Sequence, residues 1–177
     1  MQGYTGNTTL APIDFLGVNY YTRHVARSDV VPDGENAPRS VHPRDEVTDM
    51  GWEVYPEGLF EMFGRLGAEY PFSAYYITEN GAAYPDSVDG EGRVQDHERV
   101  SYLRRHLQQV TRIVDDGIPL RGHFVWSLID NFEWSYGLRK RFGLIHVDFE
   151  TGKRVPKASF DWYKDTIAQH SVRCQLF

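Results

Sequence analysis

The stretch "PFSAYYITENG" (residues 71–81) joins an apolar, aromatic-rich run to a single carboxylate and a turn signal. The composition of residues 71–78 is typical of a short buried strand. The pair Asn80-Gly81 commonly ends a strand in a turn, so Glu79 falls at the carboxyl end of this strand. Glu79 is therefore either a solvated turn residue or a carboxylate held at a strand tip for chemistry.

Strands and helices alternate along the chain. Residues 13–22 and 121–129 form two further apolar runs, which we expect to be buried strands. Apolar residues recur at helical spacing in three other segments, which predicts helices over 55–70, about 96–116 and 157–170. Strands that alternate with helices indicate parallel β/α units.

Each predicted helix has one apolar face. The expected core residues are Leu59, Phe60, Phe63 and Leu66 in the first helix, Val100, Leu103, Leu107, Val110 and Val114 in the second, and Phe160, Tyr163 and Ile167 in the third. Pro56 and Glu57 suit the first turn of the first helix. Asp96 can cap the second helix, and Gly117 and Pro119 end it.

Three parallel strands alone make an open sheet with two unpaired edges and an incompletely covered core. A closed (β/α)8 barrel has neither problem but typically needs about 250 residues. This chain of 177 residues is therefore predicted to be α/β, with residues 1–177 forming a single partial TIM-barrel unit. Residues 26–51 carry three prolines and several charges without periodicity, and we expect a long surface loop there.

Composition argues against several classes of partner. The formal net charge is -6 with scattered Lys and Arg, which disfavours nucleic acid or an anionic membrane surface. No apolar run approaches the roughly 18 residues of a membrane span. The single cysteine, Cys174, cannot form an internal disulfide, and the first residues lack signal-peptide features, so we expect a cytoplasmic protein. The seven histidines show no metal-ligand spacing, and neither a metal nor a cofactor is expected.

Aromatic residues make up 14% of the chain, including four Trp and eleven Tyr. A core built from large side chains explains this content. A sugar-binding cleft is the alternative, because the apolar faces of sugar rings stack on aromatic rings. Composition alone favours the core.

Polar and aromatic side chains follow all three predicted strands, in "NYY" (19–21), "TEN" (78–80) and "WSLIDNFEW" (126–134). In a (β/α)8 barrel, the loops at the carboxyl ends of the strands carry the active site. Carboxylates, amides, phenols and indoles therefore converge at one edge, which favours a functional site.

Five motifs extend this pattern: "DFLGVNYY", "MGWEVYPEGL", "YITENGAAYPD", "VWSLIDNFEWSYGLRKRFGLIHVDF" and "PKASFDWY". Together they resemble the C-terminal part of family 1 glycoside hydrolases, the β-glucosidase family, over about residues 12–163. Members of that family are (β/α)8 barrels that hydrolyse β-glycosides with retention. The resemblance implies that the chain corresponds to about strands six to eight and acts on terminal β-D-glucosides, galactosides or fucosides.

The resemblance implies a catalytic role for Glu79. The Glu of the family's "TENG" motif is the nucleophile, which must stay ionised to attack the anomeric carbon and form a glycosyl-enzyme intermediate. Tyr21 would hydrogen-bond Glu79 and hold it in position, and Asn19 would lie near the same subsite. The family's non-proline cis peptide bond would fall between Trp126 and Ser127.

The resemblance also implies a sugar-binding wall. Trp126 would lie under the sugar ring, and Glu133 with Trp134 would bind the outer hydroxyls of the glycone. The carboxylate of Glu133 favours a neutral sugar and repels a sugar phosphorylated at the 6-position. Trp52 would lie on the aglycone side, and Phe142 would close the wall. Plain core packing is the alternative for Trp126, Trp134 and Phe142. For Trp52 the alternative is a loop residue that seals the end of a helix.

The second catalytic carboxylate is missing. The family's "NEP" motif, whose Glu is the general acid/base, does not occur in the sequence. Retaining hydrolysis needs two carboxylates about 5 to 5.5 Å apart, and Glu133 resembles a substrate-binding residue. We therefore expect a fragment, inactive or very weak alone, that needs the N-terminal part of the same barrel. A non-catalytic carbohydrate-binding module and a structural barrel fragment are the alternatives.

Overall fold

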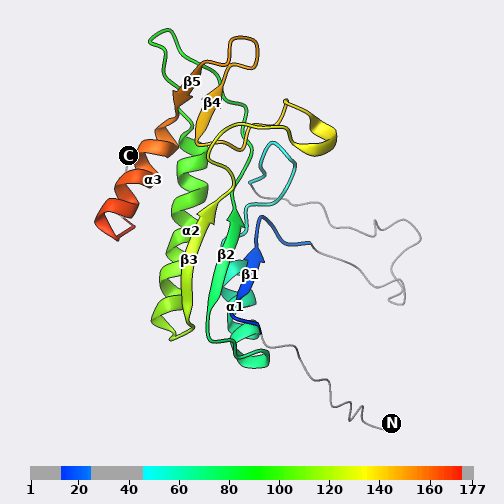
Figure 1. Cartoon of the computed structure of the whole chain (residues 1–177), viewed down its shortest axis with the longest axis vertical. Coiled ribbons are helices and arrows are strands. Elements are labelled where there is room, and N and C mark those ends of the chain that lie inside the picture. The colour runs from blue at the N-terminus through cyan, green and yellow to red at the C-terminus, as the bar shows by residue number, and fades with distance from the viewer. Residues whose placement is uncertain (1–12, 25–45, 173–177) are drawn as a thin grey trace, which may run out of the picture.

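Three parallel strands form the centre of the fold in a computed structural model, which describes residues 13–24 and 46–172 (Figure 1). The strands are β1 (Leu16–Asn19), β2 (Tyr75–Asn80) and β3 (Leu120–Val125), in the order β1-β2-β3. This confirms the predicted parallel strands and shifts their bounds. Glu79 lies inside β2 and not after it, because it pairs with Asn19 of β1.

The described residues form three α-helices at the predicted places. They are α1 (Glu57–Glu69), α2 (His97–Asp115) and α3 (Ala158–Gln169). Leu59 and Phe63 of α1 and Ile113 of α2 pack with Tyr75 and Ile77 of β2 in one core cluster. The helices α1 and α2 therefore cover one face of the sheet, as alternating β/α units require.

Two of the predicted core positions are wrong. Val114 is 50% exposed and Ile167 is 56% exposed. Each lies in the last turn of its helix, with its side chain exposed to solvent and not packed on the core. In α2, Ile113 is fully buried in place of Val114.

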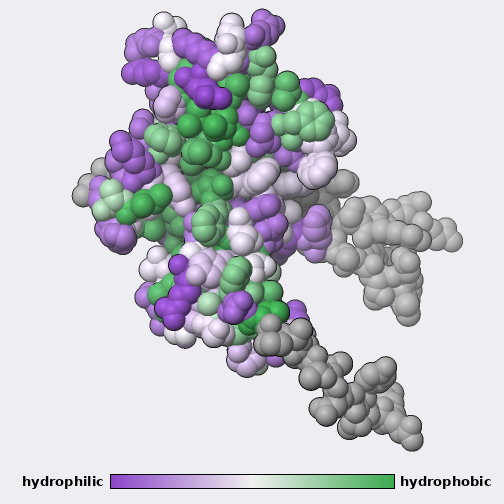
Figure 2. Space-filling view, viewed as in Figure 1, coloured by the Kyte–Doolittle hydropathy of each residue, from purple (hydrophilic) through white to green (hydrophobic). Residues whose placement is uncertain are grey.

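The other face of the sheet is exposed. Phe15, next to β1, is 50% exposed, and Phe124 of β3 is 56% exposed. Thr78 of β2 is exposed as well. Figure 2 shows hydrophobic side chains along the middle of the molecule, where the strands run in Figure 1. A closed barrel would bury this face in its interior.

A small hairpin follows the main sheet and was not predicted. It consists of the antiparallel strands β4 (Ile145–Val147) and β5 (Arg154–Pro156). Asp148 begins the turn between them, and its Oδ1 accepts the backbone N–H groups of Glu150 and Thr151. Strands of three residues are too short for a period-2 pattern to indicate them.

Charged side chains form a buried ion network between the helices and loops. The cations are Arg99, Arg141 and Lys157, and the anions are Asp86, Asp96 and Asp130. Lys157 Nζ lies 2.9 Å from Asp130 Oδ1, and Arg141 Nη1 lies 2.7 Å from Asp130 Oδ2. Although burial opposes it, these two cations hold the pKa of Asp130 below its usual value. Equal numbers of opposite charges keep the buried network neutral, which such burial requires.

Asp96 precedes α2 as predicted but does not cap it with its side chain. Its backbone carbonyl accepts the N–H groups of Arg99 and Val100. Its carboxylate instead accepts hydrogen bonds from the Arg99 guanidinium and from the N–H and hydroxyl of Ser159. The side chain therefore joins the start of α2 to the start of α3.

Part of the predicted loop at 26–51 lies outside the described residues, as does Cys174. Within its described end, Val47 forms an isolated antiparallel bridge with Glu53 across a turn. In the ranges that the structure describes, none of the helices has the length and apolar character needed to cross a membrane.

Burial of His106 predicts a pH-dependent stability. Its pKa falls to about 3 because burial disfavours the imidazolium. The unfolded chain takes up this proton below about pH 6.5, whereas the folded chain does not. The free energy of unfolding should therefore fall as pH drops from 6.5 toward 3, by up to about 1.4 kcal/mol per pH unit from this residue.

Urea unfolding at a series of pH values measures this slope. In His106→Phe, which keeps a ring beside Tyr102, the pH dependence should be shallower than in the wild type. The exposed His170, in a left-handed backbone conformation that Asn tolerates, supplies the control variant His170→Asn. An unchanged slope in His106→Phe would show that His106 does not cause the acid sensitivity.

Candidate active site

A cavity of about 680 Å³ opens beyond the carboxyl ends of β2 and β3. Its lining residues are Tyr21, Met50, Trp52, Glu79, Trp126, Asn131, Phe132, Glu133, Trp134, Ser135, Tyr136 and Phe142. Seven of the eight predicted site residues are among them. The volume lies within the range of about 300–1,000 Å³ that is usual for small-molecule sites.

Glu79 is held by the two residues that follow β1. The Tyr21 hydroxyl donates a hydrogen bond to Glu79 Oε2 at 2.6 Å, and the Tyr20 N–H donates to the Glu79 carbonyl at 2.9 Å. Burial, the hydrogen bond and the charge of Glu79 all raise the pKa of Tyr21. Tyr21 therefore stays a hydrogen-bond donor at every ordinary pH. The contact expected between these two residues is present.

Aromatic rings form one wall of the cavity. The ring centroid of Tyr21 lies 5.5 Å from that of Trp52 and 6.1 Å from that of Phe142. Trp52 and Phe142 lie 6.2 Å apart. Only 3% of Phe142 is exposed, so it both packs in the interior and lines the cavity. Edge-to-face contacts of this kind fix the orientation of the Tyr21 ring.

A second carboxylate, Glu133, shares the cavity with Glu79. Burial raises the pKa of Glu133 above its ordinary value, and the negative charge of Glu79 adds to the rise. The Trp126 side chain opposes this rise in the pKa. The peptide bond between Trp126 and Ser127 is cis, as expected. Glu79 at the end of β2 and the residues Trp126 and Glu133 after β3 therefore line one cavity.

Two predicted residues differ from the others. Trp134 lines the cavity but is 82% exposed, and it begins the 3₁₀ turn Trp134–Tyr136. Asn19 pairs with Glu79 in the sheet register but does not line the cavity. Its exposed side chain accepts a hydrogen bond of 2.7 Å from the Thr78 hydroxyl. Asn19 therefore lies next to Glu79 in the sheet but outside the cavity lining.

Gly81 and Asn131 matter to the site but were missed by the sequence analysis. A Cβ atom on Gly81 would collide with the carbonyl oxygen of Trp126. The Asn131 side-chain amide donates to Ser127 Oγ at 3.0 Å and to the Ile129 carbonyl at 3.2 Å. In the sequence, Gly81 was assigned to a turn, which hid its packing against Trp126. No sequence pattern indicated a role for Asn131. Asn131 holds the segment that follows Trp126 by hydrogen bonds, and Gly81 leaves room for its backbone.

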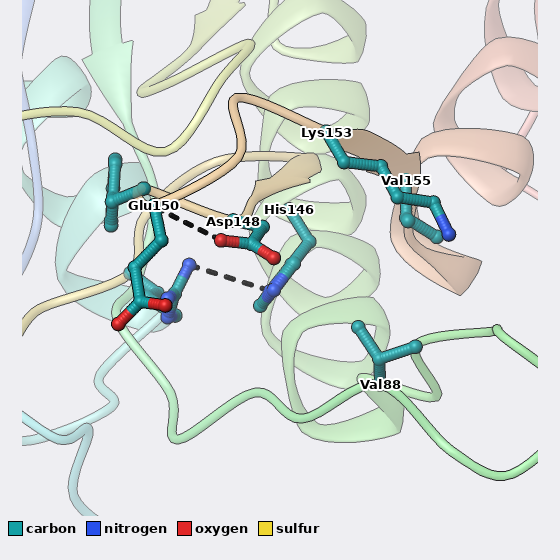
Figure 3. Close-up of a pocket in the computed structure, with 8 residues that line it drawn as sticks. Val88, His146, Asp148, Glu150, Lys153 and Val155 are labelled. Carbon is teal, nitrogen blue, oxygen red and sulfur yellow. Dashed lines mark hydrogen bonds between the residues drawn. The ribbon is translucent and has the colours of Figure 1, made fainter.

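A second cavity, of about 460 Å³, lies beside the β4–β5 hairpin (Figure 3). His146 Nδ1 faces Arg141 Nη1 there at 3.4 Å, and burial together with Arg141 lowers the pKa of His146. Asp148, which also lines this cavity, accepts backbone hydrogen bonds from its own turn. None of the eight predicted site residues lines it. Across the described part of the chain, no cluster of three His, Cys, Asp or Glu side chains could hold a metal ion.

Residues 7–172 match glycosyl hydrolase family 1, and the chain belongs to this family. It is 45% identical over 160 residues to a 1,4-β-D-glucan glucohydrolase from Thermotoga neapolitana, a match that covers 90% of this chain and 36% of that protein. It is 44% identical to a bifunctional β-D-glucosidase/β-D-fucosidase from Bifidobacterium breve, and this match covers 92% of this chain and 38% of that protein.

A solved structure gives the same result. The family 1 β-glucosidase from Thermotoga maritima, in complex with isofagomine lactam, matches with a TM-score of 0.85 at 41% identity. The match covers 92% of this chain and 36% of that one. The chain thus spans just over a third of the length of its relatives, and its fold corresponds to a part of their TIM barrel.

The close approach of Gly81 to Trp126 predicts that Gly81→Ala is destabilising. The added Cβ must displace the Trp126 carbonyl, and overpacking of this kind costs about 1–3 kcal/mol. Gly64, on the exposed side of α1, has nothing within 4 Å of an added Cβ. Gly64→Ala should instead stabilise the chain by about 0.5–1 kcal/mol.

Urea unfolding monitored by circular dichroism measures both changes. Tryptophan fluorescence should also change in Gly81→Ala and stay unchanged in Gly64→Ala. Equal free energies of unfolding for the two variants would show that Gly81 does not lie close to the Trp126 carbonyl.

Proposed function

We propose that this chain supplies the nucleophile and part of the glycone subsite of a retaining β-glycosidase. The observation that carries the proposal is the hydrogen bond from Tyr21 to Glu79 inside a cavity with aromatic and carboxylate lining. Membership of family 1 supports the reaction class. The N-terminal part of the same barrel would supply the general acid/base, and the strands described above would be about the sixth to eighth.

Glu79 acts as the nucleophile in this proposal. Its carboxylate attacks the anomeric carbon, the bond to the leaving group breaks, and a glycosyl-enzyme ester forms. Water, activated by the acid/base residue of the N-terminal part of the barrel, then hydrolyses the ester with overall retention. The Tyr21 hydroxyl, which donates to Oε2, fixes the carboxylate for the attack.

Glu133 and the tryptophans bind the sugar in this proposal. A sugar ring stacks on Trp126. The Glu133 carboxylate accepts hydrogen bonds from the outer hydroxyls of the sugar, and Trp134 packs over them. Trp126 and Glu133 line the same cavity, and the Trp126 side chain lowers the pKa of Glu133. The related enzymes support terminal β-D-glucosides and β-D-fucosides as substrates, with galactosides a further candidate. A cytoplasmic location stays a prediction from the sequence.

Binding without catalysis is the second candidate function. The cavity lining combines aromatic rings with carboxylates, and such groups bind a sugar whether or not a reaction follows. Titration of the chain with glucose or a thio-glucoside, read by tryptophan fluorescence, measures binding. Saturable binding of the sugar would support this second function if the chain, joined to the rest of a barrel, showed no hydrolysis of a β-glucoside.

Replacement of Glu79 tests the catalytic proposal. A chimera in which this chain replaces the matched segment of the Thermotoga maritima β-glucosidase supplies the rest of the barrel. Glu79→Gln should lower kcat for 4-nitrophenyl β-D-glucoside at least about 1,000-fold, because the neutral amide is a poor nucleophile. Glu69→Gln, at an exposed position of α1, is the matched control and should keep full activity. Full activity of Glu79→Gln would refute the proposal.

Replacement of Glu133 tests the sugar-binding role. In the same chimera, Glu133→Gln should raise KM for the glucoside about 10-fold or more, because a hydrogen bond to a charged group contributes about 1.5–3 kcal/mol. The preference for the glucoside over its 6-phosphate should fall at the same time, since the repelling charge is gone. The ratio of kcat/KM for the two substrates measures this preference. An unchanged ratio would show that Glu133 does not face the 6-position.

A further inference from the structure

The side chain of Asn80 lies fully buried at the end of β2, directly after Glu79. Its Nδ2 donates to the Tyr20 carbonyl at 2.9 Å and to the Tyr102 hydroxyl at 3.2 Å. Its Oδ1 lies 3.1 Å from His123 Nε2. Burial lowers the pKa of His123 to about 4, so the ring is neutral near pH 7, and we place its proton on Nε2, facing Oδ1. One buried amide therefore links the segment after β1 to α2 and β3.

Tyr102 continues this chain of hydrogen bonds from α2. Its side chain is fully buried, and its ring stacks on His106 with centroids 3.9 Å apart. Its hydroxyl donates to the backbone carbonyl of Tyr21 at 3.0 Å. The hydroxyl of Tyr21 in turn donates to Glu79. Because Glu79 and Asn80 are neighbours in the chain, the contacts form a closed ring: Asn80, Tyr102, Tyr21 and Glu79.

The ring depends on the Tyr102 hydroxyl. Burial raises the pKa of Tyr102 well above 10, so the hydroxyl keeps its proton and remains both donor and acceptor. Without it, the Tyr21 carbonyl would lose a buried hydrogen bond and the Asn80 amide would lose one of its two acceptors. The segment that ends β1 could then shift, and the Tyr21 hydroxyl would shift with it.

We propose that Tyr102 is a positioning residue for the nucleophile, acting through the backbone of Tyr21 and without touching the substrate. The proposal rests on the proposed function of Glu79. It assigns to α2, which packs behind the sheet, a direct hydrogen-bonded connection to the active site. A displacement of about 1 Å at a reacting group can lower a rate by up to about 100-fold, so a connection of this kind has a measurable effect.

The test compares Tyr102→Phe with Tyr75→Phe, and each variant removes one buried hydroxyl. Tyr75 is also fully buried, but its hydroxyl bonds the carbonyls of Leu66 and Tyr70 at the far end of β2. In the chimera described above, Tyr102→Phe should lower kcat about 10-fold with KM changed less than about twofold. Tyr75→Phe should keep kcat, although both variants lose stability. Active sites are counted from the burst of aryl product, so loss of folded protein does not lower kcat.

A second measurement does not depend on turnover. Carbon-13 NMR of the chain with labelled glutamate follows the side-chain carboxyl of Glu79, assigned by its absence in Glu79→Gln. Its signal should move in Tyr102→Phe and stay in place in Tyr75→Phe. Unchanged kcat or an unmoved signal in Tyr102→Phe would overturn the inference. Activity that survives Glu79→Gln would instead refute the proposed function, and the NMR signal would still decide whether Tyr102 positions Glu79.

Discussion

The buried amide of Asn80 is the constraint on which the rest of the site depends. A buried amide must find partners for its donors and its acceptor, because each unpaired group costs about 1–3 kcal/mol. Asn80 meets this requirement only if the residue after β1, the first half of α2 and strand β3 lie in their observed places. Its backbone carbonyl also accepts the N–H of Trp126 at 3.0 Å. Glu79, Tyr21 and Trp126 are thereby brought to one edge of the sheet.

The ion network holds the loop that supplies another part of the cavity lining. Asp130 and Arg141 form an ion pair at the two ends of the loop that carries Glu133 and Trp134. Asp130 Oδ1 also accepts the N–H of Gly143, next to Phe142, at 2.9 Å. Buried polar contacts therefore hold residues next to Glu79 and next to Phe142 in the chain. The aromatic and carboxylate lining of the cavity can be exposed to a ligand without losing its shape, because buried contacts support it.

Periodicity predicted the helices and parallel strands well, because apolar faces must be buried. It failed at residues whose conformation or hydrogen-bond partners are set by contacts distant in the sequence. Asn80-Gly81 has the composition of a turn, yet Asn80 is a strand residue because its amide is satisfied inside the fold. Asp96 stands at the cap position but bonds Ser159 of a distant helix. The site residues followed from the family resemblance and not from spacing. The link from Tyr102 to Tyr21 joins residues 81 positions apart, and no local pattern indicates such a contact.

The central claim is that Glu79 forms the covalent bond to the sugar, and trapping that bond tests it most directly. A 2-deoxy-2-fluoro-glucoside with a dinitrophenyl leaving group forms the glycosyl ester faster than water removes it, so the intermediate accumulates. The chimera with the Thermotoga maritima β-glucosidase is treated with this compound, digested with a protease and analysed by mass spectrometry. We expect one fluoroglucosyl adduct, on Glu79. An adduct on another residue, or none despite turnover of the ordinary glucoside, would contradict the claim.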